Sequence, residues 1–309
     1  MIDISCIIIN YNTSEYTLNC IRSILATHKG KISYEIIVVD NASEKEDYFK
    51  LEKGIKDLNT SNLHLVKSKQ NVGFGGGNMM GVQHCSPCRY YAFINNDTLL
   101  PEEDTFGKLF KFMEEHEYVG VCSPQMLDED HKFRMTIDHF SSVPREILRR
   151  PILEFLFPKK FLNRKVFYDK PTRADYVQGS FMFTRTEDFN AIGGFDTNLF
   201  LYYEESDLCR RLLKERNKNT YLIPDVQYIH FKGASTKKNV VMKTELKLSL
   251  LYNIRKHYGF WAYKILLTHL QIRYFFTSIV KPHYFPLWKV LLRGANISES
   301  IKNKQPIKP

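Results

Sequence analysis

The sequence lacks the features that define several common protein classes. No Gly-Lys-Ser/Thr follows a glycine-rich turn, which excludes a P-loop. No second Cys-x-x-Cys exists to complete a zinc site with Cys85 and Cys88, so incidental placement of that pair is favoured over metal or redox chemistry. No segment is clean enough in apolar residues for a good spanning helix. Internal repeats and low-complexity segments are also missing.

Disulfides and an export signal are not expected either. The six cysteines are scattered, and a chain of this size does not need disulfides for stability. Met1-Ile2-Asp3 lacks the basic region of a signal peptide, and the apolar run that follows is too short. We therefore expect a protein of the reducing cytoplasm.

The charge of the chain is unevenly distributed. The formal net charge is +10, and from Lys237 onward the only acids are Glu245 and Glu299. A basic tail indicates nucleic acid, anionic lipid or a phosphorylated ligand as partner, and a solvated basic face is an equally open interpretation. The ordinary hydrophobic and charged fractions, 43% and 25%, predict a folded core in one large α/β domain or two smaller ones.

Apolar strands alternate with helical segments in the first part of the chain. We expect strands over 4–10, 35–40, 64–67, 90–94 and 119–122, and helices over 13–25, 44–58 and 101–115, with a further helix starting in a glycine cluster near 73. This alternation predicts βαβ units and a mostly parallel sheet. Residues 125–173 should form an irregular excursion with short helices, followed by a strand over 176–184, a helix over 205–215 and short strands over 221–223 and 226–230.

The tail from about Val241 has helical spacing of apolar residues, with basic residues beside Trp261, Tyr274, Phe275 and Phe276. This pattern favours an amphipathic helix at an anionic membrane surface, and the alternative is a helix packed on the rest of the protein. The sequence thus divides into residues 1–240 and a basic helical extension, 241–309.

Polar side chains follow two of the predicted strands. Asn95-Asn96-Asp97 ends the strand over 90–94, where open α/β sheets bind ligands. Asp97 is a candidate ligand for Mg²⁺ or Mn²⁺ completed by phosphate oxygens, or else it caps a turn. Asp40 ends the strand over 35–40 and could accept hydrogen bonds from a base or sugar, or cap a helix.

The glycine cluster 71–78 does not fit a dinucleotide fingerprint. That motif follows the first strand, which here leads into Asn10-Tyr11-Asn12, and Met80 occupies the place of its third glycine. The cluster indicates a turn whose backbone approaches a ligand, or a plain tight turn.

Three acids and one histidine lie further along. Glu204, Glu205 and Asp207 open a predicted helix, where acids favour the positive end of the dipole and one could serve as general base. His230 could bind a metal or a diphosphate, or be structural.

The order of these segments is similar to that of the inverting family-two glycosyltransferases with the GT-A fold, most of all the rhamnosyltransferase-like branch that builds bacterial surface polysaccharides such as lipopolysaccharide. The segments are IIINYN (7–12), VVDNAS (38–43), NVGFGGGN (71–78), INND (94–97), VQGSFMFTR (177–185), GGFDTNLFLYYEESDLCRR (193–211) and HFKGAS (230–235). The resemblance covers residues 1–240 and implies a GT-A domain there.

The resemblance also implies roles for individual residues. Asp40 would contact the nucleobase, Asp97 would be the metal-binding end of a DxD-type motif that begins here with Asn95, and His230 would lie near the metal and diphosphate. Glu205, where the family usually has Asp, would be the catalytic base, supported by Glu204 and Asp207. The nucleotide sugar would be held by Asn10, Asn12, Asp40, Asn41, Gly73, Gly75, Asn78, Asn96, Asp97 and Gly179.

The resemblance implies a metal-dependent, inverting transfer of L-rhamnose from dTDP-rhamnose, with UDP-hexose or UDP-N-acetylhexosamine donors as alternatives. The acceptor would be a glycan or a lipid-linked oligosaccharide at the cytoplasmic face of the inner membrane. Two alternatives remain. One is a glycoside hydrolase, which needs a carboxyl pair and no nucleotide. The other is a nucleic-acid-binding protein, and the acidic first half of the chain argues against it. The acceptor, the linkage and the oligomeric state do not follow from the sequence.

Overall fold

A computed structural model describes residues 1–28, 32–148, 150–231 and 239–308. Its strands are β1 (Ile2–Asn10), β2 (Tyr34–Asp40), β3 (Leu63–Lys67), β4 (Cys88–Asn95), β5 (Thr98–Leu99), β6 (Val119–Leu127), β7 (Ile137–Asp138), β8 (Thr172–Ala174), β9 (Tyr176–Val177), β10 (Phe181–Arg185) and β11 (Asn219–His230). Its α-helices are α1 (Ser14–Thr27), α2 (Lys45–Leu58), α3 (Gly73–Gln83), α4 (Thr105–Glu115), α5 (Val143–Leu148), α6 (Arg150–Leu156), α7 (Thr186–Ala191), α8 (Glu204–Arg216), α9 (Val240–Val280) and α10 (Phe285–Leu292). Short 3-10 helices span Pro282–Tyr284, Ile297–Glu299 and Ile301–Lys304.

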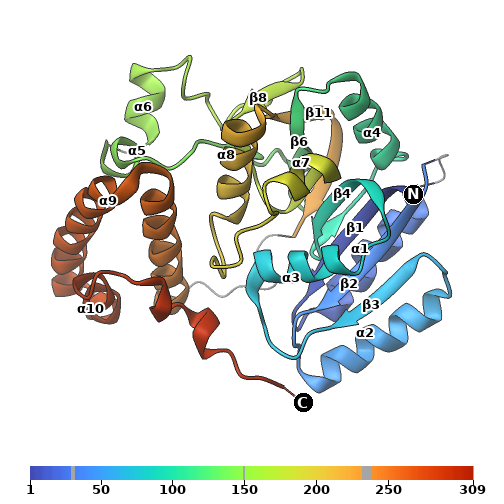
Figure 1. Cartoon of the computed structure of the whole chain (residues 1–309), viewed down its shortest axis with the longest axis horizontal. Helices are drawn as coiled ribbons and strands as arrows, with labels where there is room; N and C mark the ends of the chain where they lie inside the picture. The colour runs from blue at the N-terminus through green and yellow to red at the C-terminus, as the bar shows by residue number, and fades with distance from the viewer. Residues whose placement is uncertain (29–31, 149, 232–238, 309) are drawn as a thin grey trace.

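A mixed, mostly parallel sheet forms the centre of the molecule, as the alternating pattern predicted. Its order is β3-β2-β1-β4-β10-β6-β11-β5, with β8 paired to β11 (Figure 1). Strands β1 to β4 are parallel to their neighbours in the order β3-β2-β1-β4, while β10 runs antiparallel to both β4 and β6. The carboxyl ends of β1, β2 and β4 therefore lie at one edge of the sheet.

Helices cover both faces of this sheet because successive side chains of a strand point to opposite sides. On one face, Ile4 and Ile8 of β1 pack in a core with side chains of α1, α2 and α4. On the other face, Ile7 packs in a second core with side chains of α7 and α8. Burial on both sides explains the continuous apolar runs of the sequence.

The glycine cluster forms the start of α3, as expected. A Cβ on Gly77 would come within 2.9 Å of Ile9 Cδ1, and one on Gly81 within 2.5 Å of Ile7 Cγ2. These two glycines thus let α3 approach β1 closely. Gly73 has φ +79°, and a Cβ there would meet the Phe200 carbonyl at 2.1 Å, so the helix entry requires glycine.

Three predicted boundaries need correction. The strand expected over 176–184 is divided at 178–180, because β9 pairs with β7 while β10 pairs with β4 and β6, and the residues between them line a cavity. The strands expected over 221–223 and 226–230 form one strand, β11, whose pairing with β6 shifts register between Ile223 and Gln227 around Pro224. The excursion over 125–173 contains the short helices α5 and α6, as expected, but residues 125–127 belong to β6 and 172–173 to β8, and the short strand β7 was not predicted.

The C-terminal helices pack on one another and on the sheet domain. Helix α9 is divided at Gly259 (φ 85°), and its two parts share a core with α10 (Figure 1). Ser249 Oγ donates to the Leu201 carbonyl at 2.8 Å, and His257 Nε2 lies 2.8 Å from Asp207 of α8. The final residues return to the sheet domain, where Gln70 Nε2 donates to the Gln305 carbonyl. Of the two interpretations of the tail, packing on the domain is thus observed.

Candidate active site

Two adjoining cavities lie where β1, β2 and β4 end. The first, here the sheet-edge cavity, has a volume of 390 Å³, and the second, the central cavity, has 370 Å³. Phe74, Asn95 and Leu201 line both. Asparagine amides from three strand ends or turns, Asn41, Asn71 and Asn96, give the sheet-edge cavity donors and acceptors.

Asp97 and His230 meet at one side of the central cavity. His230 Nε2 lies 3.0 Å from Asp97 Oδ1, and Phe231 N donates to the Asp97 carbonyl at 2.9 Å. Strand β11 brings this histidine from 133 positions away, since His230 pairs with Thr98. His230 Nδ1 is buried without a hydrogen-bond partner among the described residues. The motif HFKGAS continues into residues 232–235, which lie outside the described residues.

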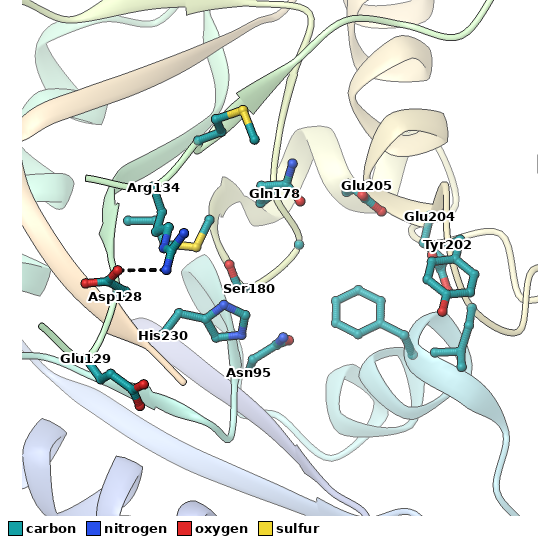
Figure 2. Close-up of a pocket in the computed structure, with 15 residues that line it drawn as sticks. Asn95, Asp128, Glu129, Arg134, Gln178, Ser180, Tyr202, Glu204, Glu205 and His230 are labelled. Atoms are coloured by element: carbon teal, nitrogen blue, oxygen red, sulfur yellow. Dashed lines mark ion pairs between the residues drawn. The ribbon is translucent and has the colours of Figure 1, made fainter. Parts of the chain in front are cut away.

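The opposite side of the central cavity carries Glu204 and Glu205, as Figure 2 shows. They open α8 directly after Tyr202 and Tyr203, which adopt left-handed φ values of 76° and 73°. Non-glycine residues in this region cost of order 1–3 kcal/mol each and persist only where the surrounding structure holds them. The strained turn therefore fixes the direction in which the two acids leave the helix end.

Burial raises the pKa values of both carboxyls. Burial, with the charge of Asp138 adding to it, raises the pKa of Glu205 to about 7. The pKa of Glu204 is raised further by burial and by the neighbouring charge of Glu205, and its Oε1 is buried without a hydrogen-bond partner among the described residues. A carboxyl with a pKa near 7 is suited to accept a proton at neutral pH.

Asp207, the third acid of the run, has a different environment. Its carboxylate is buried and lies 2.8 Å from Arg211, 2.7 Å from Lys256 and 2.8 Å from His257. Burial acts to raise its pKa, but the hydrogen bond from His257 and the charges of Arg211 and Lys256 lower it to about 2. Because it lines neither cavity, Asp207 joins α8 to α9 and does not support Glu205 directly.

The structure brings most of the predicted site residues together. Asn41, Gly73 and Asn96 line the sheet-edge cavity, and Gly179, Glu204, Glu205 and His230 line the central one. Asp97 reaches that cavity through its contact with His230.

Six predicted ligand-binding residues do not line either cavity, namely Asn10, Asn12, Asp40, Gly75, Asn78 and Asp97, the last of which contacts the lining residue His230. Asp40 is buried and accepts hydrogen bonds from Asn10 Nδ2 at 2.9 Å and from Ser43 N at 3.1 Å. Asn78 Nδ2 donates to the Phe74 carbonyl within α3. These residues hold the strand ends and turns in place around the cavities.

Other cavity residues were missed from the sequence. Asp128 and Arg134, an ion pair of 2.8 Å, extend from the hairpin after β6 toward His230 (Figure 2). The acidic run 128–130 directly after a strand was the signal that could have found them. Ile301 and Gln305 line the sheet-edge cavity, and no pattern in the tail indicates this, because it results from the return of the chain to the domain.

Among the described residues, no three His, Cys, Asp or Glu side chains are grouped to hold a metal unaided. Asp97 and His230 supply one oxygen and one nitrogen, which fits a divalent cation whose remaining ligands come from phosphate and water.

Comparison with known proteins is consistent with this geometry. The chain is 27% identical over 216 residues to the low-salt glycan biosynthesis hexosyltransferase Agl10 of Haloferax volcanii, covering 69% of this chain and 62% of the relative. It is 26% identical over 195 residues to rhamnosyltransferase WbbL of Escherichia coli, covering 60% of this chain and 71% of the relative. The chain thus spans less than two thirds of the hexosyltransferase it matches.

Among solved structures, GalNAc-T7 with UDP, GalNAc and Mn²⁺ has a TM-score of 0.64 at 14% identity, covering all of this chain and 59% of that one. The shared architecture confirms the expected GT-A fold. The family model "Glycosyl transferase family 2" matches residues 5–189, more than half of the chain. The chain therefore belongs to glycosyl transferase family 2.

Proposed function

We propose that this glycosyltransferase transfers L-rhamnose from dTDP-L-rhamnose, with inversion, to a glycan or lipid-linked acceptor in surface-polysaccharide synthesis. One observation carries the mechanism: His230 lines one side of a cavity whose opposite side presents Glu205 (Figure 2), and Asp97 lies 3.0 Å from His230 Nε2. A relative named rhamnosyltransferase supports the sugar.

The sheet-edge cavity would hold the nucleotide. Its amides, Asn41, Asn71 and Asn96, can pair with a base and ribose, and Gly73 lets the backbone come close. In this arrangement Asp40, which accepts from Ser43 N, would hold the turn that presents Asn41, whose side chain donates to Asn71 and to the Gly73 carbonyl.

Asp97 and His230 would hold Mg²⁺ or Mn²⁺ together with the donor diphosphate. When bound, the cation supplies Lewis-acid stabilisation to the leaving nucleoside diphosphate. With Nε2 on the cation, Nδ1 of His230 carries the ring proton and could donate it to a phosphate oxygen, since it has no hydrogen-bond partner among the described residues. That GalNAc-T7 was solved with Mn²⁺ supports the choice of cation.

Glu205 would remove the proton of the acceptor hydroxyl as that oxygen attacks the anomeric carbon. The new C–O bond forms as the bond to the diphosphate breaks, in one in-line displacement, so the configuration inverts. Burial poises Glu205 for this step because it raises the pKa of the carboxyl to about 7.

A panel of nucleotide sugars tests this function. We expect dTDP-rhamnose to raise the melting temperature in the presence of Mn²⁺ and to support transfer, and the anomeric configuration of the product to be inverted. If the enzyme uses a UDP-hexose or UDP-N-acetylhexosamine instead, the proposed donor is wrong, and the proposed roles of Asp97, Glu205 and His230 still hold. If no nucleotide raises the melting temperature, a glycoside hydrolase is favoured. If the protein binds nucleic acid with an affinity that falls steeply with salt, a nucleic-acid-binding protein is favoured.

We also propose that the C-terminal helices bring the enzyme to the cytoplasmic face of an anionic membrane. Among the described residues, no helix combines the length and apolar character to cross a bilayer. The second part of α9 nevertheless exposes Trp261 (77%) and Phe276 (62%), with the exposed Lys264 on the same helix. Exposed aromatics beside basic residues are typical of interfacial helices.

A further inference from the structure

A larger cavity adjoins the central cavity at Glu205. It has a volume of 640 Å³ and lies between α5, α6 and α9, which Figure 1 shows beside α8. Gln178, Tyr202 and Glu205 line both this cavity and the central one. The proposed base therefore stands between the two spaces.

Cationic side chains dominate the walls of this third space, here the basic cavity. Acids are fewer, and Asp138 is shared among three guanidinium groups, with Arg145 at 3.3 Å, Arg150 at 2.8 Å and Arg164 at 2.8 Å. Arg145 also lies 3.8 Å from Glu146 and Arg164 lies 3.8 Å from Glu154, so Arg150 is the one of the three whose ion pair is with Asp138 alone among the described residues. The six cations that line the cavity are Arg145, Arg150, Arg164, Lys165, Lys247 and Arg273, and the four acids are Asp138, Glu146, Glu154 and Glu205.

The arginine cluster retains unused hydrogen-bonding capacity. The Nε atoms of Arg145, Arg150 and Arg164 are buried, and each has no hydrogen-bond partner among the described residues. Arg145 is only 3% exposed. A buried donor left unpaired costs about 1–3 kcal/mol, which a bound anion would recover. Guanidinium groups are well suited to phosphate because two N–H donors match two oxygens.

Helix α9 adds two cations from the opposite wall. Within the part of the chain that the structure describes, neither Lys247 nor Arg273 lies within ion-pair distance of an acid. Burial, and then the charges of Arg273 and Arg145, lower the pKa of Lys247, although Glu146 acts in the opposite sense. The two cations of this wall are therefore left without an ion-pair partner among the described residues, and Glu146 acts on Lys247 only from a longer distance.

We propose that the basic cavity binds a phosphate or diphosphate group of the acceptor, so that Lys247, Arg273 and the arginine cluster hold the anion while the acceptor hydroxyl reaches Glu205. This inference rests on the proposed function and names the class of acceptor, a phosphate-bearing glycan or glycolipid. The donor diphosphate is a separate group, because its proposed ligand His230, which contacts Asp97, lies across the central cavity from Glu205. Helix α6, which lines the cavity with Arg150, Pro151 and Glu154, also exposes Phe155 (84%), and an exposed apolar side chain on this helix suits a lipid-linked acceptor.

Inorganic pyrophosphate is the probe. The full chain is first saturated with dTDP and Mn²⁺, and pyrophosphate is then titrated by calorimetry. We expect saturable binding that Lys247→Gln and Arg273→Gln each weaken by at least about tenfold. Lys247→Arg keeps the charge and should bind like the wild type. The matched control is Lys264→Gln, which removes a cation from the same helix outside the cavity.

The outcomes separate this inference from the proposed function. Failure of dTDP to bind would reject the proposed function, whereas binding of dTDP with no pyrophosphate heat would reject the basic cavity as an anion site. Equal affinity in wild type, Lys247→Gln and Arg273→Gln would place the anion elsewhere and overturn the proposal. Melting curves of the variants check that each is folded.

Sedimentation with phosphatidylglycerol vesicles separates an acceptor phosphate from a bilayer head group. We expect the Lys247→Gln and Arg273→Gln proteins to sediment like the wild type, since their charges face the cavity. Loss of sedimentation with unchanged pyrophosphate affinity would assign these cations to the membrane surface and overturn the acceptor assignment.

Discussion

Replacing Glu205 by Gln should remove transfer and, at the same time, stabilise the protein at alkaline pH. The amide has nearly the same shape but cannot accept the acceptor proton, so we expect turnover to fall ~10²–10⁴-fold with dTDP binding unchanged. The wild-type rate should rise with pH through about 7, because only the ionised carboxylate can act as base.

The stability effect follows from the same pKa. Burial raises the pKa of Glu205 from 4.5 to about 7, with Asp138 contributing, and this difference corresponds to about 3 kcal/mol. The raised value means that the folded state keeps a proton that the unfolded state has lost. The contribution of protonated Glu205 to the free energy of unfolding is therefore fully present below pH 4.5 and is lost as the pH rises through about 7. Relative to the wild type, Glu205→Gln should gain up to about 3 kcal/mol between pH 4.5 and pH 8.

Urea denaturation of both proteins at pH 5 and pH 8 measures this gain. Asp207→Asn is the control, because the pKa of Asp207 is lowered to about 2 and its contribution is lost only as the pH falls through that value. It should destabilise the protein at both pH values, and more at pH 5, because it also removes the hydrogen bond and charge that favour protonated His257. A stability difference between Glu205→Gln and wild type that does not change with pH, or a flat wild-type rate from pH 6 to 8, would refute the assigned environment of Glu205.

Three other predictions concern ligands and the membrane. Asp97→Ala should weaken Mn²⁺-dependent dTDP binding by at least about tenfold, on the order of 1.4 kcal/mol, because His230 alone cannot hold the cation. Unchanged affinity by calorimetry would exclude Asp97 from the site. Removal of residues 301–309 should weaken dTDP binding about tenfold, since Ile301 and Gln305 line the sheet-edge cavity. Circular dichroism would check that the helices remain. Full affinity would show that these residues do not contribute to donor binding. Trp261→Ser should reduce sedimentation with anionic vesicles and leave dTDP binding intact, and equal sedimentation would argue against α9 as the membrane contact.

The sequence alone predicted the sheet, the flanking helices and the positions of the chemical groups at strand ends. The buried runs ending on Asp40 and Asp97 were sufficient, because parallel strands covered on both faces must be apolar and their polar ends must meet at one edge. The helix that starts in the glycine cluster was also predictable, since close packing against β1 excludes a side chain at Gly77 and Gly81.

Only the tertiary structure decided which polar groups face the cavities. Glu205 and Asp207 are two positions apart, yet one stands between two cavities with its pKa raised and the other is ion-paired to α9 with its pKa lowered. That difference comes from Lys256 and His257, some fifty positions along the chain, and from the strained turn at Tyr202 and Tyr203. The basic cavity likewise depends on Asp138 gathering arginines from separate segments. Local sequence cannot encode such pairings, because the desolvation that sets each charge depends on chain segments that meet only in the folded state.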